Sequence, residues 1–262
     1  LKAGTSYAPP AITEYFGPGA SSALTHGGQH VLISGRNFGS AAEDHVYNII
    51  DNATYTDASQ VLYTDVWTAH FCFVQKDHVL INCTTGVGVG KELAWTIVID
   101  GQVSEQATTA YGIPVIKNII GRNGNADLVE KGITDGGEHV QLIGENFGPS
   151  GTSYLESVKY GKSGSEYDVK NCVCIDHNKI NCVMPPGIGA SLVWTVKVQG
   201  QESFTSSATF SYAPPSILRV VPAIGRTKGG DVIRVEGINF GLPDPKAYTK
   251  VLFDGQRLLP IK

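Results

Sequence analysis

Residues 27–39 read GGQHVLISGRNFG, and this stretch decides the fold because the chain contains three copies of its pattern. The other copies are GGEHVQLIGENFG at 136–148 and GGDVIRVEGINFG at 229–241. Each copy starts with a Gly-Gly pair, alternates apolar and polar residues, and ends in Gly-x-Asn-Phe-Gly. Such alternation is typical of an antiparallel strand with one buried face. Three copies in register predict three repeated units of β-structure.

The alternation also predicts which side chains of these strands face a core. The expected inward residues are Val31 and Ile33, Val140 and Leu142, and Ile233 and Val235; Ser34, Gln141, Arg234 and Glu236 are expected to face outward. We expect the phenylalanines of the motif, Phe38, Phe147 and Phe240, to fill the interior of each unit. The Asn and Gly that flank them suit the positive φ of a turn.

A second motif sets the length of the units. The sequences YAPPAI, YGIPVI and YAPPSI begin at Tyr7, Tyr111 and Tyr212, so the period is roughly 100 residues. We therefore expect a first domain at 7–110, a second at 111–211 and part of a third at 212–262. Residues 1–6 match the segments before Tyr111 and Tyr212, and are expected to be the closing strand of a preceding or neighbouring domain.

Two more motifs occur in the second half of the first two units. The sequences DHVLINC at 77–83 and DHNKINC at 176–182 predict a hairpin that turns near its histidine. The sequences WTIVIDGQ at 95–102 and WTVKVQGQ at 194–201 predict a strand that buries Trp95 or Trp194 before a glycine turn. Trp67 has no counterpart in the second unit, so its place is open between surface and core.

The five cysteines fit disulfides better than a metal site or a nucleophile. Because the two strands of a hairpin are neighbours, we favour the pairs Cys72 with Cys83 and Cys172 with Cys182. Cys174 is then free, or it exchanges with Cys172. The rival is zinc, with His78 and His177 as added ligands, but each hairpin supplies too few ligands at the usual spacing.

Two N-glycosylation acceptor sequences occur in the first unit, at Asn52 (Asn-Ala-Thr) and Asn82 (Asn-Cys-Thr). Together with paired cysteines they indicate an oxidising, secretory environment, so we expect an extracellular protein, secreted or at the cell surface, that carries N-linked glycans. Asn52 lies in a polar stretch and is the better acceptor, since a disulfide beside Asn82 would hinder its modification.

Composition argues against several functional classes. The net charge is −4 and the pI is near 6.0, and no run of Lys and Arg could neutralise a phosphate backbone, so nucleic acid is not expected as a partner. No apolar stretch approaches the ~20 residues of a membrane span. Neither a nucleophile with a base nor a carboxylate cluster with calcium spacing is present. We therefore expect no enzyme activity, no catalytic residue, no cofactor and no metal.

Taken together, the motifs resemble those of the IPT/TIG family, the immunoglobulin-like domains of plexins and fibrocystin-like surface proteins. The matching sequence runs from Tyr-x-Pro-Pro-x-Ile through Gly-Gly and Gly-x-Asn-Phe-Gly to Cys-x-x-Pro-Pro-Gly, which ends at Gly187. The first unit departs from it at Cys83-Thr84-Thr85-Gly86, and the second has Ile113 in place of the first proline. The resemblance covers nearly the whole chain. It implies an all-β fold of tandem immunoglobulin-like β-sandwiches, each with seven or eight strands, and binding or scaffolding roles.

These observations predict a non-enzymatic structural or adhesive glycoprotein whose repeats form a rod or a head-to-tail fibril. Its expected partners are adjacent repeats of a longer chain or copies of itself, which could complete the partial units by strand addition. The alternative is a ligand-binding segment of a receptor ectodomain. A third reading is a sandwich module attached to a secreted carbohydrate-active enzyme.

Overall fold

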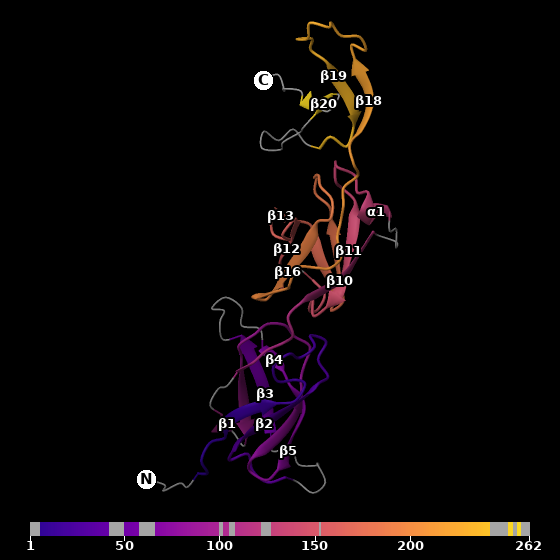
Figure 1. The fold of residues 1–262 in the computed structure, drawn as a ribbon. Helices are drawn as coiled ribbons and strands as arrows, with labels where there is room; N and C mark the ends of the chain where they lie inside the picture. The colour runs from indigo at the N-terminus through magenta and orange to yellow at the C-terminus, as the bar shows by residue number, and fades with distance from the viewer. Residues whose placement is uncertain are drawn as a thin grey trace, which may run out of the picture.

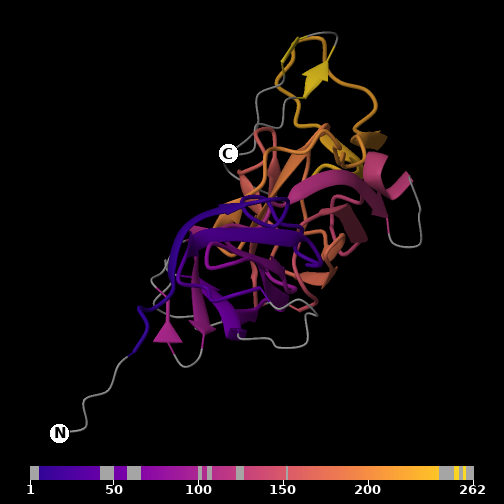
Figure 2. The same ribbon diagram turned by 90° about the horizontal axis from the view of Figure 1, so that it is seen from below.

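A computed structural model describes the chain in the ranges 6–41, 50–57, 66–99, 102–104, 108–121, 127–151, 153–241, 251–253 and 256–257. The expected closing strand at 1–6 lies almost wholly outside them. The units follow one another along a line (Figure 1), and Figure 2 views them from below, with the first domain in front. Strands dominate the fold, and the helix of the described residues is the single turn α1 (Asp127–Glu130). The all-β prediction is confirmed.

The first domain is a sandwich of two antiparallel sheets. One sheet has the order β1-β2-β6-β5, with strands β1 (Ala11–Phe16), β2 (His30–Arg36), β6 (Leu80–Thr84) and β5 (His70–Lys76). The other has the order β4-β3-β7-β8, with strands β4 (Val66–Thr68), β3 (Ile50–Asp57), β7 (Leu93–Ile99) and β8 (Gln102–Val103). A short strand, β9 (Thr108–Thr109), also pairs with β7.

The second domain repeats this arrangement. One sheet has the order β10-β11-β15-β14, with strands β10 (Val115–Gly121), β11 (His139–Glu145), β15 (Lys179–Val183) and β14 (Cys172–Asp176). The other has the order β13-β12-β16-β17, with strands β13 (Tyr167–Asp168), β12 (Leu155–Gly161), β16 (Val193–Val198) and β17 (Gln201–Glu202). The shared strand order shows that the repeated motifs encode the same fold twice.

The third unit contains the start of the same pattern. Strands β18 (Ser216–Val221) and β19 (Arg234–Ile238) pair in the way that β1 pairs with β2. Strands β20 (Leu252–Phe253) and β21 (Gln256–Arg257) form a separate small ribbon. No strand of the described residues covers the other edge of β19, where β6 and β15 lie in the complete domains.

Each complete domain has its own core, built from the inward positions that the alternation predicts. Val31, Ile33 and Leu142 have no exposed surface and Val140 is 1% exposed. Trp95 and Trp194 are also fully buried, one in each core, as expected from their strands. The aromatic rings supply much of the apolar area that each small sandwich removes from water.

The tyrosine of the Tyr-x-Pro-Pro motif belongs to the core of the sandwich before it. Tyr111 is buried in the first core and donates its hydroxyl proton to the carbonyl of Gly86 at 2.7 Å. Tyr212 is buried in the second core and donates in the same way to Pro185 at 2.7 Å. The motif that marks the start of a unit in the sequence therefore begins inside the preceding domain.

Candidate functional site

The Gly-x-Asn-Phe-Gly motif and the histidine hairpin together form one end of each sandwich. In the second domain, Gly144 N–H donates to the carbonyl of Asn178 at 2.9 Å, and Phe147 N–H donates to that of His177 at 3.0 Å. Phe147 and its counterpart Phe38 are fully buried, as predicted, and Phe240 of the partial third unit is 40% exposed. The motif thus locks the hairpin turn to the strand beside it.

The asparagine of the motif has a second role that the sequence did not reveal. Asn37, Asn146 and Asn239 adopt φ of 64°, 61° and 61°, as the turn was expected to require. Their side-chain amides donate to carbonyls of the linker, at Pro9 (2.9 Å), Ile113 (3.1 Å) and Pro214 (3.2 Å). The same contact at three linkers shows that the motif fixes where the chain enters each domain.

Two disulfides staple the hairpins, and they are the pairs that the sequence favoured. Cys72 is bonded to Cys83 across β5 and β6, and Cys172 to Cys182 across β14 and β15. Cys174 keeps a free, buried thiol that contacts the carbonyls of Phe147 and Gly148. Burial raises the pKa of this thiol to about 11, with the nearby Asp176 adding to the rise. The thiol is therefore protonated and unreactive at neutral pH.

The histidines of the hairpins do not belong to any metal-binding cluster of the described residues. Across the described ranges, no group of three or more His, Cys, Asp and Glu side chains is placed to hold a metal ion. Four of the five cysteines, including both that flank His78 in sequence, are joined in disulfides, and the fifth, Cys174, contacts backbone carbonyls. His177 instead faces the first domain, where its Nδ1 lies 2.9 Å from the hydroxyl oxygen of Thr25.

The first two domains meet in a joint that is built around Val89. This residue lies in the loop after the cystine hairpin of the first domain, yet it is 1% exposed and belongs to the hydrophobic core of the second. It packs against Gly148, where a Cβ atom would stand 2.6 Å from the Val89 Cγ1 atom. Gly148 also has a φ of +89°, so backbone conformation and contact both require glycine. Val89 of the first domain thus fills the end of the hydrophobic core of the second domain, and we call it the plug.

Polar contacts surround the plug on both sides. Thr25 N–H donates to the side-chain oxygen of Asn146 at 3.4 Å, in addition to the contact between Thr25 and His177. The side-chain amide of Gln201 donates to the carbonyl of Tyr111 at 2.9 Å in a buried position. These contacts tie the second domain both to a loop of the first and to the linker between them, which restrains rotation as well as separation.

Trp67, whose place the sequence left open, lies at this joint. It packs against the hydrophobic clusters of both domains, and its ring centroid is 5.5 Å from that of Tyr154 in the second domain. The lack of a counterpart to Trp67 in the second unit is consistent with a role at one particular joint. Sequence periodicity could not place it, because its partner lies on another domain.

At the second joint Ile188 occupies the position equivalent to Val89, but it is 47% exposed, whereas Val89 is buried. Ile188 follows the cystine hairpin of the second domain as Val89 follows that of the first, and both sit between two glycines. A Cβ atom on Gly241 would stand 2.5 Å from the Cγ2 atom of Ile188. The repeated Gly-aliphatic-Gly sequence could therefore have marked the residue that contacts the next domain. That contact can be recognised only in a structure that contains both domains.

The two histidines at the first joint are close enough to influence each other. The ring centroids of His26 and His177 are 6.2 Å apart, in an edge-to-face arrangement. Burial lowers the pKa of His177, the nearby His26 lowers it further, and Asp176 opposes both. At neutral pH the joint therefore holds an uncharged His177, which suits its contact with the Thr25 hydroxyl.

The two predicted glycosylation sites lie in strands of the first domain. Asn52 lies in β3, opposite Val98 of β7, and its side chain is outside the described residues. Asn82 lies in β6, a central strand, on the outward face of its sheet. Its side-chain oxygen lies 3.2 Å from Nδ1 of His30. Neither position is taken up by the joint.

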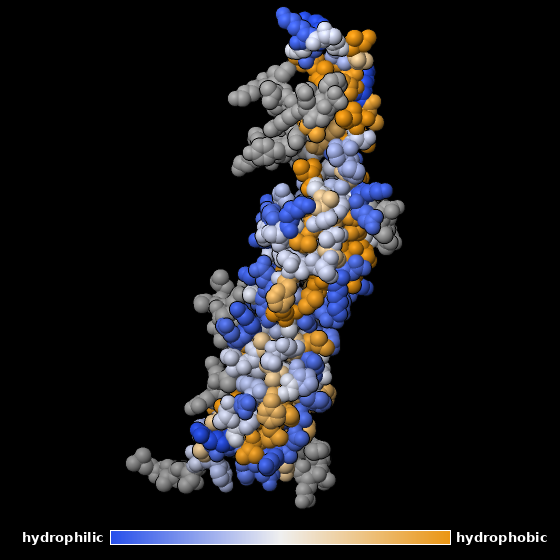
Figure 3. Space-filling model, in the orientation of Figure 1, coloured by the Kyte–Doolittle hydropathy of each residue, from blue (hydrophilic) through white to orange (hydrophobic). Residues whose placement is uncertain are grey.

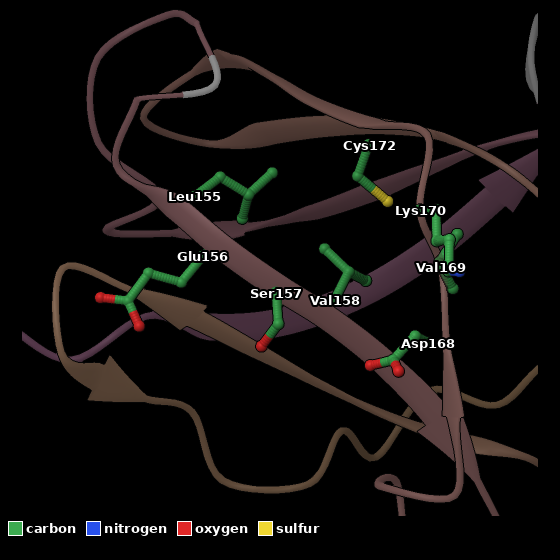
Figure 4. A pocket seen from close by; sticks show the side chains of 8 residues that line it. All are labelled: Leu155, Glu156, Ser157, Val158, Asp168, Val169, Lys170 and Cys172. Carbon is green, nitrogen blue, oxygen red and sulfur yellow. The ribbon is translucent and has the colours of Figure 1, made fainter.

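An open hollow of about 260 Å³ lies at the side of the second domain, between the edges of its two sheets (Figure 4). It is lined by Leu155, Glu156, Ser157, Val158, Asp168, Val169, Lys170 and Cys172. Glu156 is engaged by Lys197 at 2.6 Å, and the sulfur of Cys172 is bonded to Cys182. The lining thus offers a few polar groups to a ligand, without a free thiol.

The second domain matches a known family. The model of the IPT/TIG domain matches residues 128–212, which span most of that domain. No curated protein matches the chain. In the described residues there is no helix with the length and apolar character of a membrane span.

Three solved structures that are similar to the chain come from longer proteins. One is SGBP-B from a xyloglucan utilization locus of Bacteroides uniformis, with 17% identity, a TM-score of 0.28, and coverage of 74% of this chain and 47% of that one. The extracellular region of plexin A4 has 18% identity, a TM-score of 0.34, and coverage of 85% and 17%. The Escherichia coli adhesin FdeC has 12% identity, a TM-score of 0.29, and coverage of 78% and 63%. The chain thus spans less than two thirds of each.

Proposed function

Because residues 128–212 form an IPT/TIG domain, we propose that the chain is part of a non-enzymatic, extracellular structural or adhesive glycoprotein whose tandem sandwiches act as a rod. The observation that carries this proposal is the joint, in which Val89 of one domain completes the core of the next. A plug of this kind converts two sandwiches in series into one stiff piece. Stiffness over distance is what a spacer or a fibre component needs.

The extracellular location is supported by the chemistry of the hairpins. Disulfides persist in oxidising compartments and are rare in the cytosol, and each complete domain contains one. The acceptor sequences at Asn52 and Asn82 agree with passage through a secretory pathway. We expect the native protein to carry N-linked glycans and intact disulfides.

A substitution of Val89 tests whether this residue makes the joint stiff. Val89→Ser should weaken the joint by about 2 kcal/mol, because it removes a buried aliphatic side chain from the second core. Small-angle X-ray scattering of the full chain should then show a wider distribution of maximum dimensions. Val87→Ser is the matched control, since Val87 lies two residues earlier in the same loop and is 48% exposed.

Equal scattering from the two variants would contradict a stiff joint made by Val89. Electron microscopy of the native material addresses the larger claim. Extended rods or fibres are expected, and compact isolated particles would count against a structural role.

A ligand-binding ectodomain segment is the second candidate, and the hollow beside β12 is the feature that favours it. Its open side, with Ser157, Asp168 and Lys170 in the lining, suits a polar ligand such as a peptide or a sugar. Heteronuclear NMR titration would separate the two candidates, because a ligand of this site should shift the amide signals of these residues and leave those of the joint unchanged.

A further inference from the structure

One row of side chains on the outer face of the first sheet is unusually apolar. Strand register places Phe16 opposite Leu32, Leu32 opposite Asn82, and Asn82 opposite Phe73. The residues on either side of this row along β2 and β6 point inward and are fully buried, so the row faces outward. Figure 3 shows hydrophobic surface on the first domain at the level where Figure 1 labels β2 and β5.

The centre of this row is Asn82, the acceptor of the Asn-Cys-Thr sequence. Its side-chain oxygen contacts His30, and no described residue forms a hydrogen bond with its side-chain nitrogen, the atom to which a sugar would be joined. Side chains directly opposite each other in antiparallel strands have Cβ atoms about 5 Å apart. A sugar on Asn82 would therefore lie over the Leu32 and Phe73 side chains that flank it.

The second domain provides a natural comparison at the same position. Its equivalent row is Ile120, Gln141, Asn181 and Val173. Here Gln141 donates its side-chain amide to the oxygen of Asn181 at 2.7 Å, and Val183 replaces the Thr that an acceptor sequence needs. The domain without the acceptor sequence thus has a polar, hydrogen-bonded centre. The domain with it has Leu32 and two aromatic rings instead.

This correlation has a physical explanation in the structure of sugars. A pyranose ring has faces made of C–H groups, and these pack on aromatic and aliphatic side chains as other apolar groups do, removing both surfaces from water. In this row Phe16 is 39% exposed and Leu32 and Phe73 are half-buried, so each keeps apolar surface that a sugar could cover. A glycan tethered at the middle of the row is held where it can cover Phe16, Leu32 and Phe73.

We propose that Asn82 carries an N-linked glycan whose first N-acetylglucosamine packs on the flanking side chains Leu32 and Phe73, with Phe16 next to Leu32 at the end of the row, and that this contact stabilises the first domain. The glycan is then a covering layer of the β1-β2-β6-β5 sheet. The inference rests on the proposed passage through a secretory pathway, and it makes Asn82 an acceptor despite the disulfide beside it.

The test begins with the full chain secreted from a eukaryotic host. Peptide mass spectrometry should find a sugar on Asn82. Trimming with an endoglycosidase that leaves one N-acetylglucosamine should keep the unfolding midpoint of the first domain, whereas Asn82→Gln should lower it by about 4 °C. Asn181→Gln is the matched control, because it alters the equivalent strand position without removing a glycan.

Phe73→Ala then tests the contact itself. Its effect on the midpoint should be larger in the glycosylated chain than in the Asn82→Gln background. Equal effects in the two backgrounds would overturn the packing, and a sugar on Asn52 but none on Asn82 would overturn the site. A secreted, disulfide-bonded chain without sugar at either asparagine would instead contradict the proposed glycoprotein.

Discussion

Several glycines of this sequence are required by packing, because another backbone segment or an aromatic ring lies too close to allow a side chain. The first glycine of each Gly-x-Asn-Phe-Gly motif lies beneath the phenylalanine of the same motif. At Gly144 a Cβ atom would stand 1.9 Å from the carbonyl oxygen of Val115 and 2.4 Å from Cζ of Phe147. Gly35 and Gly237 show the same close approaches. The motif is therefore a packing requirement that recurs in each unit.

This gives a prediction at the scale of one residue. Gly144→Ala should destabilise the second domain by about 3 kcal/mol, since the new methyl group must displace either backbone or a buried ring. Gly137→Ala is the control, because Gly137 has a positive φ but open space around it, so its cost should be about 1 kcal/mol. Urea unfolding of the two variants measures the difference, and equal midpoints would contradict the packing explanation.

At the scale of strands, equivalent residues of two units can differ widely in exposure. Ile116 of β10 is 5% exposed in the complete second domain, and its counterpart Ile217 of β18 is 59% exposed in the third unit. Ile119 and Val220 differ in the same direction, at 4% and 40%. Among the described residues no strand pairs with the other edge of β19, and the proposed head-to-tail assembly would bring an adjacent repeat or another copy to this face.

The corresponding prediction concerns self-association. Sedimentation of the chain should reveal larger species as concentration rises, and Val220→Asp should suppress them by placing a charge on the apolar face. Leu218→Asp is the control, since it adds the same charge to the same strand at the position where the second domain has an exposed Lys117. A chain that stays monomeric at all concentrations, or that responds equally to both substitutions, would argue against assembly through this face.

The whole molecule depends on how its domains are joined, and the first joint contains a histidine, His177, whose pKa is lowered by burial. Because the folded state lowers the pKa of His177, the unfolded state binds its proton more readily. Stability is therefore unaffected well above pH 6.5 and decreases as the pH falls through that value, until the folded state also takes up the proton. The loss of stability is expected at the interface between the first two domains, because a charged His177 would face His26 there.

We expect the unfolding midpoint of the chain to drop as the pH falls from about 7.5 through about 6.5, and to drop less in His177→Asn. Asparagine can still meet the Thr25 hydroxyl but does not titrate, so the variant isolates the charge. Differential scanning calorimetry across this range gives the measurement. His30→Asn serves as a control, because His30 lies on an exposed strand position away from the joint. An identical pH dependence in both variants would contradict the assignment to His177.

The sequence alone determined the tandem β-architecture, the inward residues of the repeated strands and the favoured cystine pairs. These features depend on contacts within one sheet or hairpin, and such contacts produce a regular alternation of apolar and polar residues or a short, repeated spacing of cysteines. Only the tertiary structure decided that Tyr111 packs in the core before it, that Val89 plugs the core after it, that Trp67 meets Tyr154, and that Cys174 keeps a free thiol. Alternation along a strand predicts which face of a sheet a side chain occupies. It does not say which other domain covers that face, because that depends on how separately folded units come together in space.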